Sequence, residues 1–487
     1  TVVSAYVGPV VERYLKALVK RLEESGFKNN LLLMLSSGLV ETVAHCVPRA
    51  VLLSELAPAA APAGAAYIGE STGRRSLISI DMGGTSLDVC LIRDGEIPTT
   101  TESWVGEERV AIKMVDIHSA GAGGGSIAWV DSLGLLRVGP HSAGAEPGPA
   151  CYGRGGKEPT VTDADLLLGY VPADFFLGGE IELARDKAEE AVKKVAQPLG
   201  MTVWQAAQAI FTTVNSFMAD QITEVSTKRG NDVRDFALVV GGGAGPVHGA
   251  AIAELLSIPV VLIPSVAAAY SAFGMFAMDV GRNYARSYIC GAKNIDIEKV
   301  NRLYGEMEAE AVAGFRANGI APEQVVFRRS AEMRYGGQFH EVEVELMGST
   351  SSPQGGGFTA QQLETTVNEF HRQHEKLYTF RMPWKAAEFL TFRLRATAPR
   401  APFHLRQIEE GGPDGASAIK RRRRCWFDGQ EVDTPVYDGA RLLAGARFSG
   451  PAIIEETTTT VVVPARFDCA VDQWKNYLLT RVEKGND

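Results

Sequence analysis

The sequence lacks the features of disulfide-rich, membrane-spanning and secreted proteins. Its six cysteines include no CxxC pair, which favours reduced thiols in a cytoplasmic protein over a disulfide framework. No segment has the long uncharged apolar run of a membrane span, and the first residues lack the charged and then apolar layout of a signal peptide. We therefore expect no membrane contact.

Excess positive charge is also missing. The chain has 49 Lys and Arg against 58 Asp and Glu, a net charge of −9. Binding the phosphate backbone of a nucleic acid needs a basic surface, so no nucleic-acid partner is expected. The one basic run, Lys420-Arg421-Arg422-Arg423-Arg424, is interpreted as a solvated surface turn or a contact with a partner protein.

What is present is typical of a globular α/β chain. Its 487 residues are 45% hydrophobic and 22% charged, which is enough for a sizeable core. Periodicity predicts strands at 77–81, 87–92 and 236–240 and a long helix over about 202–228. After about residue 285 the pattern becomes α+β, and the last seventy residues are expected to be all-β, with Ile453–Val463 as the clearest strand.

The most informative stretch is ISIDMGGTSLDVCLI at residues 78–92, where an apolar strand is interrupted by Gly83 and Gly84. Adjacent glycines weaken a strand, so the turn must need a bare backbone. Its N–H groups could approach phosphate oxygens, with the Thr85 hydroxyl as a further donor, while Asp81 is placed to hold Mg²⁺ through water. An ordinary hairpin turn explains the same pattern without a ligand.

A second glycine loop, GGGAGPVHG at residues 241–249, follows the predicted strand 236–240 and opens a helix. Backbone amides at a helix N-terminus suit anions, and glycines let a base or ribose lie against the chain. A close strand–helix crossing is the alternative, and His248 is expected to be structural. Together, the hairpin loop and the helix loop resemble the phosphate and adenosine loops of actin-like ATPases.

Longer motifs narrow the resemblance. DMGGTSLDV, VDIHSAGAGGGSIAWVD, AGAEPGPACYGRGG, TVTDADLLLGY, GGGAGPVHG and RYGGQFHEVEV occur in an order and spacing similar to the hydantoinase A/5-oxoprolinase family, and so does the C-terminal GPAIIEETTTTVVVP. The resemblance implies actin-like (ribonuclease H-like) α/β lobes and a smaller, β-rich α+β C-terminal domain. Residues 1–75 would be the remainder of a first lobe, 76–285 a second lobe and 286–487 the C-terminal domain.

The resemblance also implies a function. Family members are hydrolases that open cyclic amides such as hydantoins and 5-oxoproline, many with ATP and Mg²⁺, beside a hydantoinase B-type subunit. Others are subunits of ATP-dependent ketone carboxylases. The shared chemistry is phosphoryl activation of a carbonyl oxygen. By this resemblance, the phosphate and Mg²⁺ contacts would be Asp81, Gly83, Gly84 and Thr85, and the residues near the nucleotide would be Gly241, Gly242, Gly243 and Gly245.

Departures from the family pattern favour a third possibility, a non-catalytic scaffold subunit. Family members usually carry another hairpin of this type ahead of the helix at 1–25, and we expect that segment to be a separate chain or to have been removed. Two family loops are also substituted here, at residues 54–59 and 266–269.

Acidic and histidine side chains supply candidates for catalysis. Asp116 and His118 lie on one face if they belong to a strand, and Asp163 follows a long Gly/Pro loop. This mix suits a Zn²⁺ or Mn²⁺ ion that polarises an amide carbonyl or activates water, so the three are predicted as catalytic and metal-binding residues. Alternatively, His118 caps a glycine loop and Asp163 or Thr162 is a helix N-cap.

Three further residues are expected to have no catalytic role. Cys151 has no evident base beside it in the sequence, and lone cysteines are usually small apolar fillers. His371 and His374 are spaced by one helical turn, but no third ligand is near, so both are expected on the surface.

Overall fold

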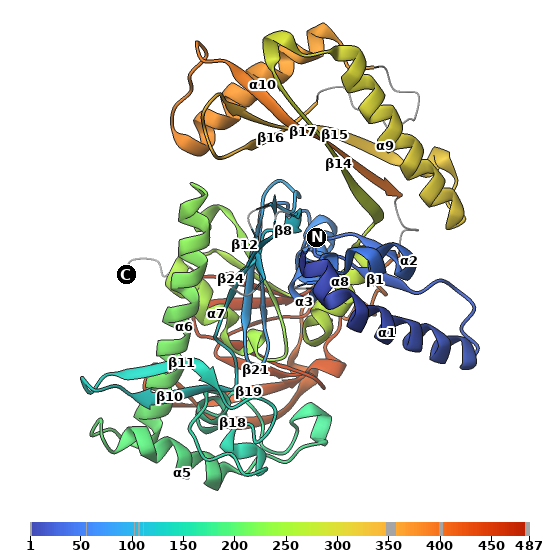
Figure 1. The fold of residues 1–487 in the computed structure, drawn as a ribbon. Helices are drawn as coiled ribbons and strands as arrows, with labels where there is room; N and C mark the ends of the chain where they lie inside the picture. Colours follow the sequence, from blue (N-terminus) through green and yellow to red (C-terminus); the bar gives the residue numbers. More distant parts are fainter. Residues whose placement is uncertain are drawn as a thin grey trace. The chain divides into compact units, whose positions relative to one another are not determined.

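The computed structural model describes residues 2–54, 56–101, 103–105, 108–110, 112–346, 357–398 and 403–482. The chain forms two compact units (Figure 1). Unit 1 comprises residues 1–54, 105–113 and 278–402, and unit 2 comprises residues 55–104, 114–277 and 403–487. Mixed helices and sheets confirm the α/β class. The division at residues 75 and 285 stays a prediction.

Unit 2 is built on an eight-stranded sheet. At its centre, β12 (Ala237–Gly241) is parallel to both β3 (Leu77–Met82) and β13 (Val260–Ile263), while β3 and β4 (Leu87–Ile92) form an antiparallel hairpin. These strands confirm the predicted segments 77–81, 87–92 and 236–240. The sheet is completed by β9 (His118–Ala120) beside β4 and, beyond β13, by β24 (Tyr477–Arg481), β23 (Phe467–Val471) and β20 (Arg447–Ser449).

Helices cover both faces of this sheet, which explains why its central strands are apolar on both sides. Ile78 and Ile80 of β3 belong to one core cluster with residues of α4 (Val161–Leu167), α5 (Arg185–Ala196), α6 (Val203–Lys228) and α7 (Gly245–Leu256). Leu77 belongs to another, with α3 (Leu56–Ser71) and α8 (Tyr270–Ala277). The predicted helix 202–228 is confirmed, with a capping box at its start. In Figure 1, α6 runs as one long helix beside the sheet.

Smaller elements complete unit 2. A four-stranded sheet contains β18 (Ile419–Phe427), β19 (Gln430–Asp438), β21 (Ala452–Glu455) and β22 (Thr460–Val463). The prediction of one strand over Ile453–Val463 was wrong, because residues 456–459 form a turn between β21 and β22. Two-stranded pairs are formed by β10 (Ser126–Val130) with β11 (Leu136–Ser142) and by β5 (Thr99–Thr100) with β8 (Met114–Val115). A further short pair, β6 (Ser103–Val105) with β7 (Glu108–Val110), does not belong to unit 2 as a whole, because residues 105–113 are part of unit 1.

Unit 1 contains a six-stranded sheet in the order β1 (Leu32–Met34), β2 (Val40–Thr42), β14 (Val280–Gly291), β17 (Ala387–Ala398), β15 (Val326–Tyr335) and β16 (Val342–Glu345). Its helices are α1 (Val2–Glu24), α2 (Val43–Cys46), α9 (Ile297–Ala317) and α10 (Ala360–Tyr378). No helix among the described stretches has both the length and the apolar character that a membrane crossing requires.

The surface position predicted for His374 was wrong. The ring is buried, with Nδ1 2.9 Å from the carbonyl oxygen of Phe380 and Nε2 3.2 Å from Oε1 of Gln338. Its neighbour His371 is partly buried and lies 2.6 Å from the Tyr335 hydroxyl. Both rings therefore fix the packing of α10 on its sheet, a role that helical spacing alone does not reveal.

The interpretation of residues 420–424 as a surface turn was also wrong. They lie in β18, and three of their cationic side chains converge on Glu455, which is 1% exposed. Arg421 Nη2 and Arg423 Nη1 each lie 2.8 Å from Glu455 Oε1, and Lys420 contacts Oε2. Burial acts to raise the pKa of Glu455, but the hydrogen bonds from Lys420 and Arg421 and the charge of Arg423 outweigh it and hold that pKa below its usual value.

Replacing Glu455 should therefore destabilise the protein. Glu455→Gln removes the negative charge that compensates three cations. Removing one partner of a buried ion pair lowers the free energy of unfolding by about 3 kcal/mol. Urea denaturation at neutral pH measures it, with Glu431→Gln as a control, because the pair of Glu431 with Arg424 is exposed and contributes less than about 0.5 kcal/mol. Equal stabilities of the two variants would contradict the assignment.

The pH dependence of this loss has a definite sign. Because the folded pKa of Glu455 is depressed, its contribution is complete above the unfolded value, 4.5, and is lost as the pH falls through the folded pKa. The stability gap between the wild type and Glu455→Gln should therefore close in acid, which the same denaturation series checks.

Candidate functional site

The tip of the β3–β4 hairpin leaves its backbone donors free. Gly83 N–H donates to the Ser86 carbonyl (3.1 Å), whereas the N–H groups of Gly84 and Thr85 have no partner among the described residues. Both residues are exposed, and a Cβ added at Gly83 or Gly84 would meet no atom within 4 Å. Unpaired amides that face open space are suited to an anion such as phosphate.

A second glycine tract, residues 121–125, supports this tip from behind. Gly124 N–H donates to the Gly83 carbonyl (3.0 Å) and Gly125 N–H to the Gly84 carbonyl (2.7 Å). A Cβ at Gly123 would lie 2.5 Å from the Gly84 carbonyl carbon, so no larger residue fits there without a backbone shift. The tract ties up the carbonyls of the tip, and the amides of Gly84 and Thr85 remain available to a ligand.

The glycines of the second loop have two different roles. A Cβ at Gly242 would lie 2.0 Å from the Met82 carbonyl oxygen, and one at Gly241 would lie 2.0 Å from the Tyr270 ring. A Cβ at Gly245 would lie 3.0 Å from a methyl group of Val240. Gly245 thus permits the close crossing of β12 and α7 that was the alternative interpretation, Gly242 makes room for β3 and Gly241 for Tyr270 of α8, whereas Gly243 lines a cavity.

That cavity has a volume of about 230 Å³ and lies within unit 2. Its walls come from the hairpin tip, the glycine tract, the start of α4, the second glycine loop and the β21–β22 turn. Polar lining residues are Thr162, Asp165, Glu456, Thr458, Thr459 and Thr460; apolar ones include Val171, Pro172, Phe175, Phe176 and Val247. The turn is fastened to the second loop, because the Thr459 hydroxyl donates to the Gly243 carbonyl (2.9 Å).

Asp81 stands at the end of β3, beside the hairpin tip. The Ser271 hydroxyl donates to Asp81 Oδ2 (2.7 Å), and the other oxygen accepts no hydrogen bond from the described residues. Burial raises the pKa of Asp81, partly offset by the Ser271 hydrogen bond. One carboxylate with a free oxygen fits Mg²⁺, which keeps most of its waters and needs few protein ligands.

The structure does not assemble the predicted set of Asp116, His118 and Asp163. Asp116 forms an ion pair with Arg229, and His118 Nε2 lies 2.8 Å from Gln221 Oε1. No group of three or more His, Cys, Asp or Glu side chains suited to a metal occurs in the part of the chain that the structure describes. These residues therefore do not fit a Zn²⁺ or Mn²⁺ ion.

Asp163 instead organises the local backbone. Its fully buried carboxylate accepts hydrogen bonds from the amides of Ala150 (3.2 Å), Cys151 (2.7 Å) and Thr160 (3.0 Å) and from the Thr160 hydroxyl (2.7 Å). The N-cap of α4 is Thr160, not Thr162 or Asp163, and Asp163 is the other half of the capping box. Burial and the adjacent Asp163 raise the pKa of the buried Cys151 thiol, so a reactive thiolate is disfavoured there.

Sequence reasoning missed the most unusual polar group of the cavity, Asp165. It lies one turn along α4 from Thr162 and is 3% exposed, yet its Oδ1 has no hydrogen-bond partner in the described chain. The signal was present in TDADLLLGY, where a second aspartate sits inside an apolar helix. Glu456 was missed for another reason, because the turn that carries it is more than 200 residues from Gly243.

Two family models match the chain. One, described as hydantoinase/oxoprolinase, matches residues 1–284, and the other, described as the hydantoinase/oxoprolinase C-terminal domain, matches residues 291–482. Caprolactamase subunit alpha of Pseudomonas jessenii is 35% identical, with 99% of this chain and 69% of the relative covered. The 5-oxoprolinase 1 of Arabidopsis thaliana is 27% identical, with 97% of this chain and 38% of the relative covered.

Solved structures agree with these matches. ATP-dependent caprolactamase from Pseudomonas jessenii has a TM-score of 0.86 at 34% identity, covering 99% of this chain and 70% of that one. Nucleotide-free acetone carboxylase has a TM-score of 0.79 at 27% identity, covering 97% and 67%. By sequence, the acetone carboxylase beta subunit of Xanthobacter autotrophicus is 29% identical over 99% of this chain and 68% of its own length.

The two glycine environments at the hairpin predict opposite responses to the same substitution. Gly123→Ala forces a methyl group against the Gly84 backbone and should cost about 1–3 kcal/mol of the free energy of unfolding, as overpacking does. Gly84→Ala meets open space and should change that free energy by less than about 1 kcal/mol. Chemical denaturation of both variants measures the difference, and a larger loss for Gly84→Ala would contradict the described packing.

Proposed function

Because the chain belongs to the hydantoinase/oxoprolinase family, we propose that it is the ATP-binding subunit of an enzyme that hydrolyses a cyclic amide. Two relatives, a caprolactamase subunit and a 5-oxoprolinase, are named for enzymes of this kind, and the caprolactamase is ATP-dependent. The activating step would be phosphorylation of the amide carbonyl oxygen, which turns a poor electrophile into a reactive one.

The observation that carries this proposal is the pair of free amides at the hairpin tip, beside the cavity. Gly84 and Thr85 would donate hydrogen bonds to phosphate oxygens, and such fixed donors stabilise charge without reorganisation during the reaction. Asp81 would hold Mg²⁺ through water, and Gly243 would border the nucleoside. When bound, ATP supplies the phosphoryl group; this chain binds and orients it.

A ketone carboxylase subunit is the second candidate. The likeness to the acetone carboxylase beta subunit extends over almost the whole chain, and carboxylation of a ketone would use the same nucleotide site for activation. A scaffold subunit without ATP binding is the third candidate, favoured by the substituted loops at 54–59 and 266–269. The first two require the hairpin to bind phosphate, and the third does not.

The proposal has further parts. The enzyme would be a heteromer, as the subunit names of the caprolactamase and carboxylase relatives suggest, and the resemblance of the sequence motifs adds a hydantoinase B-type subunit as the proposed partner. It would work in the cytoplasm, with actin-like lobes divided near residues 75 and 285. Catalytic roles for Asp116, His118 and Asp163 are not included, because neighbouring groups already engage each side chain.

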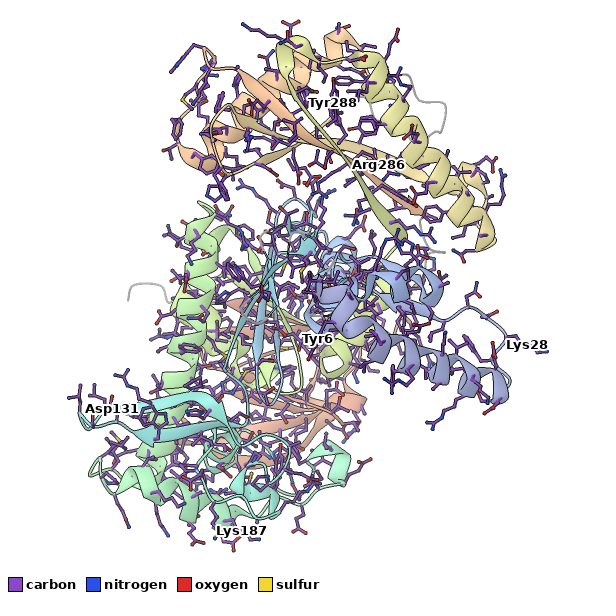
Figure 2. The ribbon with its side chains drawn as sticks, in the orientation of Figure 1. Tyr6, Lys28, Asp131, Lys187, Arg286 and Tyr288 are labelled. Atoms are coloured by element: carbon purple, nitrogen blue, oxygen red, sulfur yellow. The ribbon has the colours of Figure 1, made fainter. Side chains whose placement is uncertain are left out.

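Calorimetric titration with Mg·ATP tests the nucleotide site. Asp81→Asn removes the carboxylate charge that would hold the ion and should weaken binding by about tenfold or more, equivalent to about 1.4 kcal/mol. Asp131→Asn is the matched control, since Asp131 lies on the exposed β10–β11 hairpin (Figure 2). Its carboxylate pairs with Arg137.

The outcomes separate the three candidates. Loss of binding in Asp81→Asn but not in Asp131→Asn supports the hairpin as a phosphate and Mg²⁺ site. If binding is found, release of ADP that depends on a cyclic amide such as caprolactam or 5-oxoproline favours the hydrolase, and release that depends on a ketone and bicarbonate favours the carboxylase. Absence of Mg·ATP binding by the wild-type protein, alone and with its partner subunit, would leave the scaffold.

A further inference from the structure

Three buried polar side chains form a chain that ends at the wall of the cavity. Asp165 of α4, His248 of α7 and Asn215 of α6 are each no more than 3% exposed. His248 Nε2 lies 3.3 Å from Asp165 Oδ2, and Nδ1 lies 3.0 Å from Asn215 Oδ1. The imidazole also stacks on Phe211, at 4.9 Å between ring centroids, so Asn215 and Phe211 fix its orientation beside Asp165.

The ring of His248 lies beside Asp165 without hydrogen-bonding to it. Nε2 is 3.3 Å from Asp165 Oδ2 and has no hydrogen-bond partner among the described residues, whereas Nδ1 is paired with Asn215 Oδ1. The imidazole therefore packs against Oδ2 of the carboxylate, and Oδ1 is left without a donor from the described chain.

That remaining oxygen is the anomaly. Buried carboxylate oxygens without a hydrogen bond are costly and rare. Asp163, two residues away, shows how the same helix satisfies a buried carboxylate, with four donors. Asp165 lines the cavity, and its Oδ1 receives no donor from the described chain. A donor from a ligand would complete it.

The distribution of charge in the cavity orients such a ligand. One end carries the free amides beside Gly84, which favour an anion. Asp165 lies one helical turn beyond Thr162, whose hydroxyl donates to a carbonyl of the glycine tract. The negative charge of the Asp165 carboxylate repels phosphate. Apolar side chains, among them Val171, Phe176 and Val247, line the same cavity and suit a flat ring. A nucleotide would place its phosphates at the hairpin and its nucleoside near Asp165.

We propose that Asp165 Oδ1 accepts a hydrogen bond from an N–H or O–H group of the bound nucleoside, with His248 and Asn215 as the positioning residues that hold the carboxylate in place. This assignment rests on the proposed function and adds to it the residue that recognises the nucleoside. The donor is either the amino group of adenine or a ribose hydroxyl, and nucleotide analogues that each lack one of these groups distinguish the two sources.

Calorimetric titration of the wild-type protein compares Mg·ATP with inosine triphosphate, 2′-deoxy-ATP and 3′-deoxy-ATP. The analogue that lacks the relevant donor should bind about tenfold or more weakly than ATP, since a hydrogen bond to a charged acceptor is lost. In Asp165→Asn, the binding of ATP itself should weaken, and the affinity gap between ATP and that analogue should shrink. In Asp165→Ala the gap should vanish.

A general loss of protein stability would weaken the binding of all four nucleotides alike. A change in the preference among nucleotides therefore reports on the contact itself. His248→Gln should shrink the same gap, because Asp165 loses its positioning partner. Ser226→Ala is the control: Ser226 is also buried on α6, but it bonds to the Thr223 carbonyl and does not line the cavity.

Three results would overturn the assignment. Two concern the preference among nucleotides: a wild type that binds all four equally, or a gap that persists unchanged in Asp165→Ala. The third, given last, concerns the affinity for ATP itself. Failure of the proposed function looks different, because then the wild-type protein binds none of the four nucleotides, and the assignment falls with it. ATP binding that is normal in both wild type and Asp165→Ala rejects the nucleoside contact alone and leaves the hairpin site standing.

Discussion

The site depends on one close backbone contact, the packing of the glycine tract 121–125 against the tip of the β3–β4 hairpin. Two amide-to-carbonyl hydrogen bonds, from Gly124 to Gly83 and from Gly125 to Gly84, join the segments. No side chain fits between them at Gly123. This contact fixes a turn that would otherwise be free to move, and it directs the unpaired amides of Gly84 and Thr85 outward. The ligand chemistry proposed above depends on those amides.

The wall of the cavity that the β21–β22 turn forms depends on ion pairs between residues far apart in the sequence. Glu455, at the end of β21, is held by Lys420, Arg421 and Arg423 of β18, and the next residues form the turn that lines the cavity. The Thr459 hydroxyl then fastens this turn to Gly243. A C-terminal sheet thus completes a site that begins at residue 83. The ion cluster around Glu455 stabilises this sheet and thereby positions the turn that faces the ligand.

Sequence patterns were sufficient where the determining interactions are local. The hairpin strands, the capping box of α6 and the strand–loop–helix unit β12–α7 all follow from periodicity and turn chemistry within about ten residues, and the long motifs identified the family. The roles of single side chains could not be predicted in the same way. Asp163 was read as a metal ligand because its donors at Ala150 and Cys151 lie beyond a glycine-rich loop. The basic run 420–424 was read as a surface turn or a partner contact because Glu455, on which three of its side chains converge, is more than thirty residues away. Asp165 was overlooked because only the fold brings His248 to it.

Hydrogen exchange at the hairpin tip tests the central claim most directly. The amides of Gly84 and Thr85 are exposed and unpaired, so they should exchange rapidly in the ligand-free protein. If they bind phosphate, saturating Mg·ATP should slow exchange in peptides that contain residues 83–86, with smaller effects in 121–125. Exchange measured by mass spectrometry with and without nucleotide gives the answer. Binding of Mg·ATP that leaves residues 83–86 unprotected would contradict the account, because the nucleotide phosphates would then lie elsewhere.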